Sequence, residues 1–183
     1  MEQQIFPYKN LLPKIHKTVF IAPGVKIIGD VEIGENSSVW FNSVIRGDVH
    51  YVKIGSRTNI QDCSMLHVTN NRHPLNIGDN VTIGHSVNLH GCTLNNLCLI
   101  GIGSVVLDGA VVEKNSIVAA GAVVLPGFVV PSGKLVAGVP AKIVRDLSDE
   151  EIEDFPNSAE RYAKYSKSMQ ESIQSSEINS YRK

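Results

Sequence analysis

Residues 99–136 read LIGIGSVVLDGAVVEKNSIVAAGAVVLPGFVVPSGKLV, and an aliphatic residue returns at every sixth position of this stretch. The recurring positions are Ile100, Val106, Val112, Val118, Val124, Val130 and Val136. A period of six is too short for a helical repeat. It is typical of a parallel β-helix, in which short strands coil into a solenoid. The sequence therefore predicts an all-β fold of hexapeptide repeats.

The same period extends towards the N-terminus with three interruptions. Its aliphatic members there are Ile21, Ile27, Ile33, Val39, Ile45, Ile54, Ile60, Leu66, Ile77, Ile83, Leu89 and Leu94. The interval lengthens to nine residues after Ile45 and to eleven after Leu66, and it shortens to five after Leu89. We expect the two long intervals to form a bulge near Tyr51 and a polar loop over residues 68–74.

This pattern divides the chain into four segments. We expect a lead-in over residues 1–18, a β-helix domain over 19–145, a helical segment over 146–175 and a polar tail over 176–183.

A capping box and an apolar face predict two helices in the segment of residues 146–175. Ser148 and Glu151 have the spacing of a capping box, which marks a helix start. Pro156 is expected to interrupt this short helix, and a second helix is expected over residues 157–173. The side chains on one face of that helix are Tyr162, Tyr165 and Met169.

Composition excludes several classes of function. The net charge of −1 over 183 residues provides no basic field for nucleic acid or an anionic membrane. The first residues contain no apolar signal-peptide core, and no apolar run approaches membrane-spanning length. An odd cysteine count without a CxxC pair argues against a disulfide framework and favours buried, unreactive cysteines. We therefore expect a cytoplasmic protein with no nucleic-acid or membrane partner.

The period also predicts which residues stack. Hexapeptide solenoids generally have three hexads per coil. The period alone does not give this number, so we adopt it as an assumption. Residues three hexads apart then stack at about the inter-strand spacing of ~4.8 Å. With each long interval counted as one hexad, Ile45, Leu66 and Leu89 share one column. The residues that directly follow this column are Arg46, His67 and His90.

Two stacked imidazoles, those of His67 and His90, can converge on a metal ion at ~2.0–2.1 Å each. His85 shares a repeat slot with Asp62 on the neighbouring face, beside Gln61, and cannot easily join the pair within one chain. A neighbouring copy can supply it, and the simplest assembly is a cyclic trimer with metals at its interfaces. A lone histidine on a β surface is more often solvent-facing or hydrogen-bonded, so the shared column is what favours ligation.

Six motifs stand in order along the chain. They are Arg46-Gly-Asp48, Asn59-Ile-Gln-Asp62, His67, Ile83-Gly-His85, Leu89-His-Gly-Cys92 and Gly138-Val-Pro-Ala-Lys142. This set resembles the γ-class carbonic anhydrases over residues 12–165, and it is far more specific than the period, which acetyltransferases share. The resemblance implies a left-handed β-helix with a C-terminal helix packed alongside, assembled as a homotrimer.

The resemblance also implies a metal centre and a reaction. Zn²⁺, or alternatively Fe²⁺ or Co²⁺, would be bound by His67 and His90 of one subunit and by His85 of the next. Three neutral imidazoles leave a fourth position for water, and the cation lowers the pKa of that water towards about 7. The resulting hydroxide attacks CO₂ and yields bicarbonate. The expected activity is that of a lyase of the carbonate dehydratase type.

Further site residues follow from the same resemblance. Arg46 would pair with Asp62 across the interface, although a plain interface ion pair needs no catalytic reason. Gln61 would help to orient the metal-bound hydroxide, since its amide both donates and accepts. Asp48 would support the interface and the position of Arg46.

The chain departs from the family pattern where protons would leave the site. Val49 and Asn70 stand where the best-known members have glutamates, and this departure bears on turnover more than on metal binding. His73, in the polar loop, could replace the missing shuttle because imidazole titrates near neutral pH. Tyr162 resembles a helix tyrosine that reaches the active site in relatives, although packing of the helix is an equal explanation.

Two other functions remain open at this point. One is a hexapeptide acyltransferase or thioesterase acting on CoA thioesters, which needs no three-histidine metal site. The other is a catalytically weak metal-binding trimer. Metal content separates the first alternative from the rest, and CO₂ hydration separates an enzyme from a scaffold.

Overall fold

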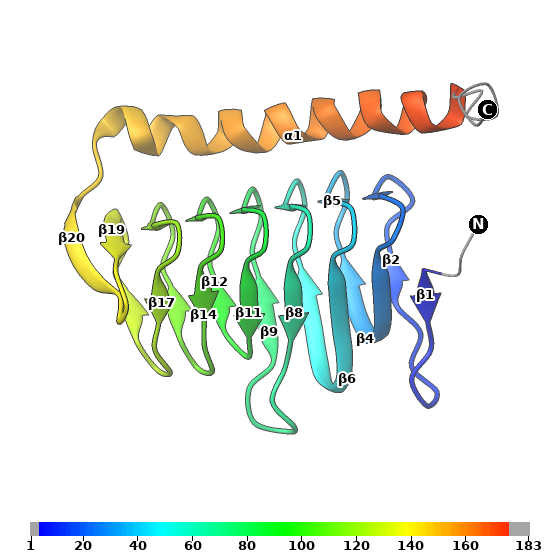
Figure 1. Cartoon of the computed structure of the whole chain (residues 1–183), viewed down its shortest axis with the longest axis horizontal. Coiled ribbons are helices and arrows are strands. Elements are labelled where there is room, and N and C mark those ends of the chain that lie inside the picture. The colour runs from blue at the N-terminus through cyan, green and yellow to red at the C-terminus, as the bar shows by residue number, and fades with distance from the viewer. Residues whose placement is uncertain (1–3, 176–183) are drawn as a thin grey trace, which may run out of the picture.

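Most coils of the solenoid consist of three short strands, one on each face of a prism (Figure 1). The computed structural model describes residues 4–175, which fold as the expected left-handed parallel β-helix with a helix alongside. Each strand pairs with the strand one coil away, so that Ile100 lies opposite Val118 and Val106 lies opposite Val124. The assumption of three hexads per coil is therefore confirmed.

The strands form three rows, which we call the first, second and third faces. The first face holds β1 (Ile5–Phe6), β8 (Met65–His67), β11 (Asn88–His90), β14 (Val105–Val106) and β17 (Val123–Val124). The second face holds β2 (Lys14–Ile15), β9 (Leu75–Ile77), β12 (Thr93–Leu94), β15 (Val111–Val112) and β18 (Val129–Val130). Two long strands, β4 (Lys26–Ile33) and β6 (Val44–Ile54), continue from the first face to the second and join them into one 12-stranded sheet.

The third face is a separate 8-stranded sheet. It holds β3 (Phe20–Ile21), β5 (Ser38–Val39), β7 (Asn59–Ile60), β10 (Thr82–Ile83), β13 (Leu99–Ile100), β16 (Ile117–Val118), β19 (Lys134–Ala137) and β20 (Lys142–Asp146). The last of these strands runs antiparallel to β19. It therefore covers an edge that a further parallel coil could otherwise extend.

The aliphatic residues of the six-residue period fill the inside of the prism. Those with no exposed surface include Ile27, Ile45, Leu66, Ile83, Ile100, Val118 and Val136. Burial of this apolar surface is the main stabilising contribution. Buried hydroxyls at the corners bond the next coil, since Ser43 Oγ donates to the Gln61 carbonyl at 2.9 Å and Ser64 Oγ donates to the Gly84 carbonyl at 3.1 Å. These two hydroxyls are thus satisfied within the stack.

The interruptions of the period leave the core intact. The nine-residue interval lies within the continuous strand β6, and the pairing of β4 with β6 shifts register there. The eleven-residue interval releases a loop, residues 68–74, which projects between β8 and β9 (Figure 1) and closes on a bridge between Thr69 and His73. Ile45 still pairs with Leu66 in the core column.

The segment expected to precede the solenoid takes part in it. Ile5 of β1 pairs with Ile27, and Ile15 of β2 pairs with Ile33, so both strands extend the 12-stranded sheet. They cover the outer edge of β4, which reduces the risk of edge-to-edge association.

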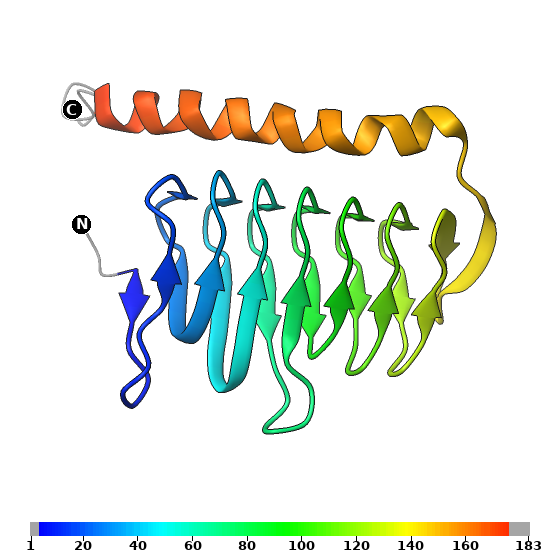
Figure 2. The same cartoon turned by 180° about the vertical axis from the view of Figure 1, so that it is seen from behind.

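A single helix, α1 (Asp149–Ser175), runs along the solenoid and packs on the third face (Figure 2). The capping box is confirmed, because Glu151 accepts from the Ser148 N–H at 2.9 Å and Ser148 Oγ accepts from the Glu151 N–H at 3.3 Å. Within residues 4–175, no helix combines the length and apolar character needed to cross a membrane. The expected tail, residues 176–183, lies outside the described residues.

The expectation that Pro156 interrupts the helix is wrong. Proline inside a helix costs about 3 kcal/mol, because it removes one backbone bond and its ring crowds the preceding turn. Packing holds the helix together on either side, since Phe155, Ser158 and Ala159 are buried against the solenoid. Ser158 Oγ also lies 3.1 Å from Thr82 Oγ1 on strand β10.

The expectation of buried cysteines holds for two of the three. Cys92 and Cys98 are buried, and burial raises the pKa of each thiol to about 12. Cys63 is exposed instead. Its φ of 60° places it in the turn after β7, where the backbone directs the side chain away from the core.

Candidate metal centre

His67 and His90 lie side by side on the first face. They end strands β8 and β11, and the register of these strands places His90 directly opposite His67, as the column predicted. The ring centroids are 5.1 Å apart. His67 Nδ1 lies 3.1 Å from His90 Nε2, so one nitrogen of each ring faces the other ring.

The outer nitrogen of each ring donates to a carboxylate. His67 Nε2 lies 3.0 Å from Asp48 Oδ1, and His90 Nδ1 lies 2.7 Å from Asp108 Oδ1. A neutral imidazole has one N–H and one lone pair. With the hydrogens on the outer nitrogens, both inner nitrogens present lone pairs to the same point. Asp48, His67, His90 and Asp108 thus form a chain of side chains across four successive coils.

This arrangement fits a divalent metal ion. A hydrogen on one inner nitrogen would make this 3.1 Å contact an N–H···N hydrogen bond, and with neither inner nitrogen protonated the two lone pairs are placed to bind a cation between them. Tetrahedral zinc with two Zn–N bonds of ~2.0–2.1 Å requires a nitrogen separation of about 3.3 Å, close to the one observed. Burial lowers the pKa of the His67 imidazole, although the hydrogen bond to Asp48 acts in the opposite direction. The ring is therefore neutral at pH 7, as ligation requires.

Arg46 and Asp48 form an ion pair at one end of this chain, through Nη1 and Oδ2. Burial opposes ionisation of Asp48, but hydrogen bonds from His67 and Arg46 outweigh it, so the pKa of this carboxyl is lowered. The carboxylate is 14% exposed and touches both the arginine and the histidine. Asp48 therefore orients His67 as well as Arg46 within one chain.

Asp108, at the other end, was not among the residues singled out from the sequence. Its Oδ2 accepts from Thr69 Oγ1 at 2.9 Å while its Oδ1 accepts from His90. Burial raises the pKa of Asp108, but the hydrogen bonds from His90 and Thr69 outweigh it and lower the pKa overall. The column continues one coil beyond His90, because Leu89 pairs with Val106, but the residue that directly follows Val106 is Leu107, so the column rule did not single out Asp108.

The loop of residues 68–74 lies against this end of the chain. A Cβ placed on Gly91 would lie 2.7 Å from His73 Cβ and 2.4 Å from Asp108 Oδ1, so glycine allows both to approach. The electrostatic effect of the nearby His73 also acts to lower the pKa of Asp108. His73 thus lies close to the carboxylate of Asp108.

His85 lies apart from the histidine pair. It follows β10 on the third face, and its Nδ1 lies 2.8 Å from Asp62 Oδ2. The two residues share a repeat slot, since Ile83 pairs with Ile60. His85 is therefore at the opposite end of the first face from His67, and within residues 4–175 no group of three metal-binding side chains forms.

A pocket of roughly 440 Å³ separates His85 and Asp62 from the helix. Trp40, Tyr162 and Met169 line it, and the rings of Trp40 and Tyr162 meet edge to face at 5.8 Å. Burial and then the charge of Asp62 raise the pKa of Tyr162. Tyr162 thus both packs the helix and faces the side chains at the corner.

Gln61 is 5% exposed at the same corner, next to Asp62. Its Nε2 donates to Asn59 Oδ1 at 3.1 Å, which fixes the orientation of the amide. Asn59 in turn donates to Thr82 Oγ1 at 3.0 Å, so this amide belongs to a buried polar network beneath the helix.

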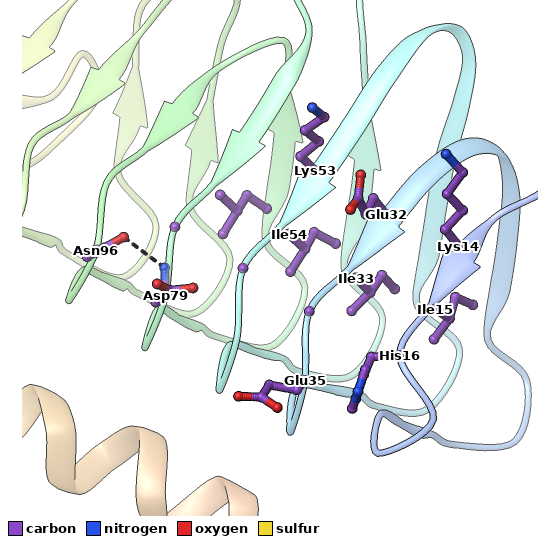
Figure 3. Close-up of a pocket in the computed structure, with 14 residues that line it drawn as sticks. Lys14, Ile15, His16, Glu32, Ile33, Glu35, Lys53, Ile54, Asp79 and Asn96 are labelled. Carbon is purple, nitrogen blue, oxygen red and sulfur yellow. Dashed lines mark hydrogen bonds between the residues drawn. The ribbon is translucent and has the colours of Figure 1, made fainter.

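A further hollow lies elsewhere on the molecule. A groove of roughly 810 Å³ follows the corner between the second and third faces (Figure 3). Lys14, His16, Glu32, Glu35 and Lys53 surround it with charges of both signs. None of the site residues expected from the sequence lines this groove.

Comparisons with known proteins agree with the motifs. A family model of the bacterial transferase hexapeptide (six repeats) matches residues 13–47. A carbonic anhydrase of Geobacillus kaustophilus is 50% identical over 91% of this chain and 93% of its own length. Gamma carbonic anhydrase 1, mitochondrial, of Arabidopsis thaliana is 48% identical over 82% of this chain and 57% of its own length.

Solved structures include a close match to the fold. A Bacillus cereus protein described as a putative acetyltransferase superposes with a TM-score of 0.89 and 42% identity, over 92% of this chain and 97% of that chain. Relatives named for two chemistries thus share one architecture. Because carbonic anhydrases match nearly the whole chain at about half identity, this chain belongs to the γ-class carbonic anhydrase-like family of hexapeptide-repeat proteins.

Proposed function

We propose that this protein is a metal-dependent carbonic anhydrase that reversibly hydrates CO₂ to bicarbonate. The observation that carries the proposal is the pair of facing nitrogens, His67 Nδ1 and His90 Nε2, 3.1 Å apart, with the outer nitrogens held by carboxylates. An acyltransferase has no need for such a pair. Zn²⁺ is the expected ion, with Fe²⁺ or Co²⁺ as alternatives that imidazole nitrogens also accept.

The proposal includes a homotrimer, because one chain supplies two imidazoles and a tetrahedral catalytic site requires three protein ligands. His85, at the other end of the first face, is the third ligand if the face of one subunit meets that of the next. Cyclic symmetry would then form three equivalent sites, each with a pair from one subunit and His85 from its neighbour.

The residues around the site would each perform one task. When bound, the cation would acidify a water molecule and so supply a nucleophile at neutral pH. Asp48 and Asp108 hold the imidazoles in the tautomers that leave the inner nitrogens free. Gln61, its amide fixed by Asn59, offers a carbonyl oxygen that can orient a polar substrate atom.

Two further residues have proposed roles at the rim. Arg46 is 41% exposed, so its guanidinium can reach Asp62 of a neighbouring subunit while it remains paired with Asp48. His73 is the candidate proton carrier, because an imidazole beside Asp108 can accept a proton from the site and release it to buffer.

Metal content and CO₂ hydration, measured on the same anaerobically purified sample, test this function. One metal ion per chain and hydration above the uncatalysed rate are expected for the natural protein. Each of His67→Ala, His85→Ala and His90→Ala should lose both. His16→Ala is the matched control, since the imidazole of His16 is exposed and bonds to Thr18, outside the site residues. Natural protein that binds stoichiometric metal without hydrating CO₂ would instead be a metal-binding scaffold.

Mixing two inactive variants tests the shared site. In trimers reassembled from equal amounts of His85→Ala and His67→Ala, about a quarter of the interfaces would combine an intact pair with an intact third ligand. Recovery of metal binding and activity to that level supports ligands from two subunits. No recovery in verified mixed trimers would contradict it.

The acyltransferase alternative rests on the Bacillus cereus structure, whose description names a putative acetyltransferase. Saturable turnover of acetyl-CoA that survives removal of metal would favour it. The His67→Ala variant discriminates further, because a metal-free transferase should tolerate that substitution.

A further inference from the structure

The two histidines of the pair are held from opposite sides by carboxylates of different origin. Asp48, which orients His67, lies on β6 and is itself fixed by Arg46. Asp108, which orients His90, lies one coil beyond β11 and is fixed by Thr69. The second arrangement depends on the loop of residues 68–74, since Thr69 belongs to it.

We propose that Asp108 is a positioning residue for metal binding, with Thr69 as its support, and this rests on the metal site proposed above. Asp108 Oδ1 accepts the hydrogen of His90 Nδ1 at 2.7 Å, which keeps that hydrogen off Nε2. Nε2 is the nitrogen that faces His67. A ligating histidine commonly donates its other N–H to a carboxylate in this way.

The backbone around Asp108 is built to hold this position. The Asp108 carbonyl accepts from the Gly127 N–H at 2.9 Å, and Gly109 N–H donates to the Gly91 carbonyl at 2.7 Å. Gly91 has no side chain, so the carboxylate lies directly over its Cα, where a Cβ would be only 2.4 Å from Oδ1. The backbone at Asp108 is thus held by the neighbouring coils, and the missing side chain at Gly91 leaves room for the carboxylate beside His90.

The inserted loop fixes the hydroxyl that completes the arrangement. Thr69 and His73 exchange backbone hydrogen bonds of 3.0 and 3.3 Å, which close the loop at its base. Thr69 Oγ1 then donates to Asp108 Oδ2 at 2.9 Å. The loop that departs from the family pattern by lacking acidic residues is therefore a support for the second histidine, in addition to carrying His73.

Nitrogen-15 NMR of the histidine rings, on the full-length chain without added metal, tests the tautomer directly. We expect His90 to carry its hydrogen on Nδ1 in the natural protein. In Asp108→Asn the hydrogen should move substantially to Nε2, because an amide can donate to Nδ1. An unchanged His90 tautomer in Asp108→Asn would overturn the inference. This readout does not depend on whether metal binds.

Competition with a chromophoric chelator measures how a changed His90 tautomer affects the affinity for Zn²⁺. Asp108→Asn should weaken binding by about 10–100-fold. Thr69→Val should weaken it less, and Thr69→Ser should restore it because the hydroxyl returns. Glu113→Gln is the matched control, since the Glu113 carboxylate accepts a hydrogen bond from Asn95 Nδ2 at 2.8 Å.

The outcomes separate the two proposals. If the natural protein shows the expected tautomer but binds no stoichiometric Zn²⁺, the proposed function fails while Asp108 still positions His90. If the natural protein binds Zn²⁺ and Asp108→Asn binds it equally well, the metal site stands and the positioning role is wrong. A change of the Co²⁺ absorption spectrum in Thr69→Val, reversed in Thr69→Ser, would support the role of the loop.

Discussion

The solenoid has a regular half and an irregular half, and the three histidines proposed as metal ligands lie in the irregular half. Over residues 93–137 the strands β14 to β18 are two residues long and their inward side chains are valines with no exposed surface. Between Ile45 and Leu94 the period is broken three times, and the histidine pair and its loop lie there. The comparison indicates that the period specifies stability, while departures from it specify chemistry.

The departures are tolerated because they leave the core columns alone. Leu66 and Leu89 are 23 residues apart in the sequence, whereas Val106 and Val124 are 18 residues apart. Both pairs nevertheless lie opposite each other on neighbouring coils. Loop closure costs little extra for a few more residues. Extra residues can therefore be added outside a coil at small cost, which makes a solenoid a suitable scaffold for an added site.

The largest effects should come from cavities made in each half. Leu66→Ala and Ile100→Ala both empty fully buried positions, so each should destabilise the protein by about 2–5 kcal/mol. Only Leu66→Ala should also weaken metal binding, because Leu66 precedes His67 and anchors its strand. Denaturant unfolding and Zn²⁺ titration measure the two effects. Equal loss of metal affinity in Ile100→Ala would break the division between the halves.

The core and its register were predictable from the sequence, for a physical reason. Inward positions of a β-helix admit little besides aliphatic side chains, so the column of Ile45, Leu66 and Leu89 could be written down from spacing alone. The pairing of His67 with His90 followed from that column. The register that confirms it contains the same three core residues.

Tertiary contacts made by loops and by the helix were not predictable from residue spacing. Asp108 matters because a loop of no regular period brings Thr69 to it, and spacing carries no information about where such a loop folds. The continuous helix through Pro156 was missed because packing of Phe155 outweighs a local preference. Local rules failed where tertiary contacts decided the outcome.

Matched glycine substitutions sharpen the comparison at a smaller scale. Gly91 and Gly121 both have positive φ, of 55° and 68°, so alanine should cost each about 1–2 kcal/mol. At Gly121, in the regular half, an added Cβ meets nothing within 4 Å. At Gly91 it would push Asp108 and His73 aside.

We therefore expect Gly91→Ala to lower Zn²⁺ affinity as well as stability, and Gly121→Ala to lower stability alone. Thermal unfolding and chelator competition on the two variants measure this difference. Metal affinity retained in full by Gly91→Ala would show that the carboxylate above that residue is not needed.

The smallest effect concerns the helix, which starts near the regular end of the solenoid and reaches the irregular half through Tyr162. Hydrogen bonds from Arg145 and then from the Ser148 N–H lower the pKa of Glu151 to about 2. A lowered pKa in the folded state stabilises the fold above the unfolded value of 4.5, and this contribution is lost as the pH falls towards 2. Acid should therefore loosen the helix start while leaving the coils, whose cores are apolar, in place.

Hydrogen exchange of the α1 amides against those of β13 to β16, followed from pH 5 to pH 2.5, checks this expectation. Ser148→Ala should imitate the acid effect at neutral pH, at a cost of about 1 kcal/mol for loss of the cap. The helix should loosen first around Glu151 and later around Tyr162, since Phe155, Ser158 and Ala159 hold the segment between them. Simultaneous loosening of helix and coils would mean that α1 and the solenoid unfold as one cooperative unit. The helix would then stabilise both halves of the solenoid.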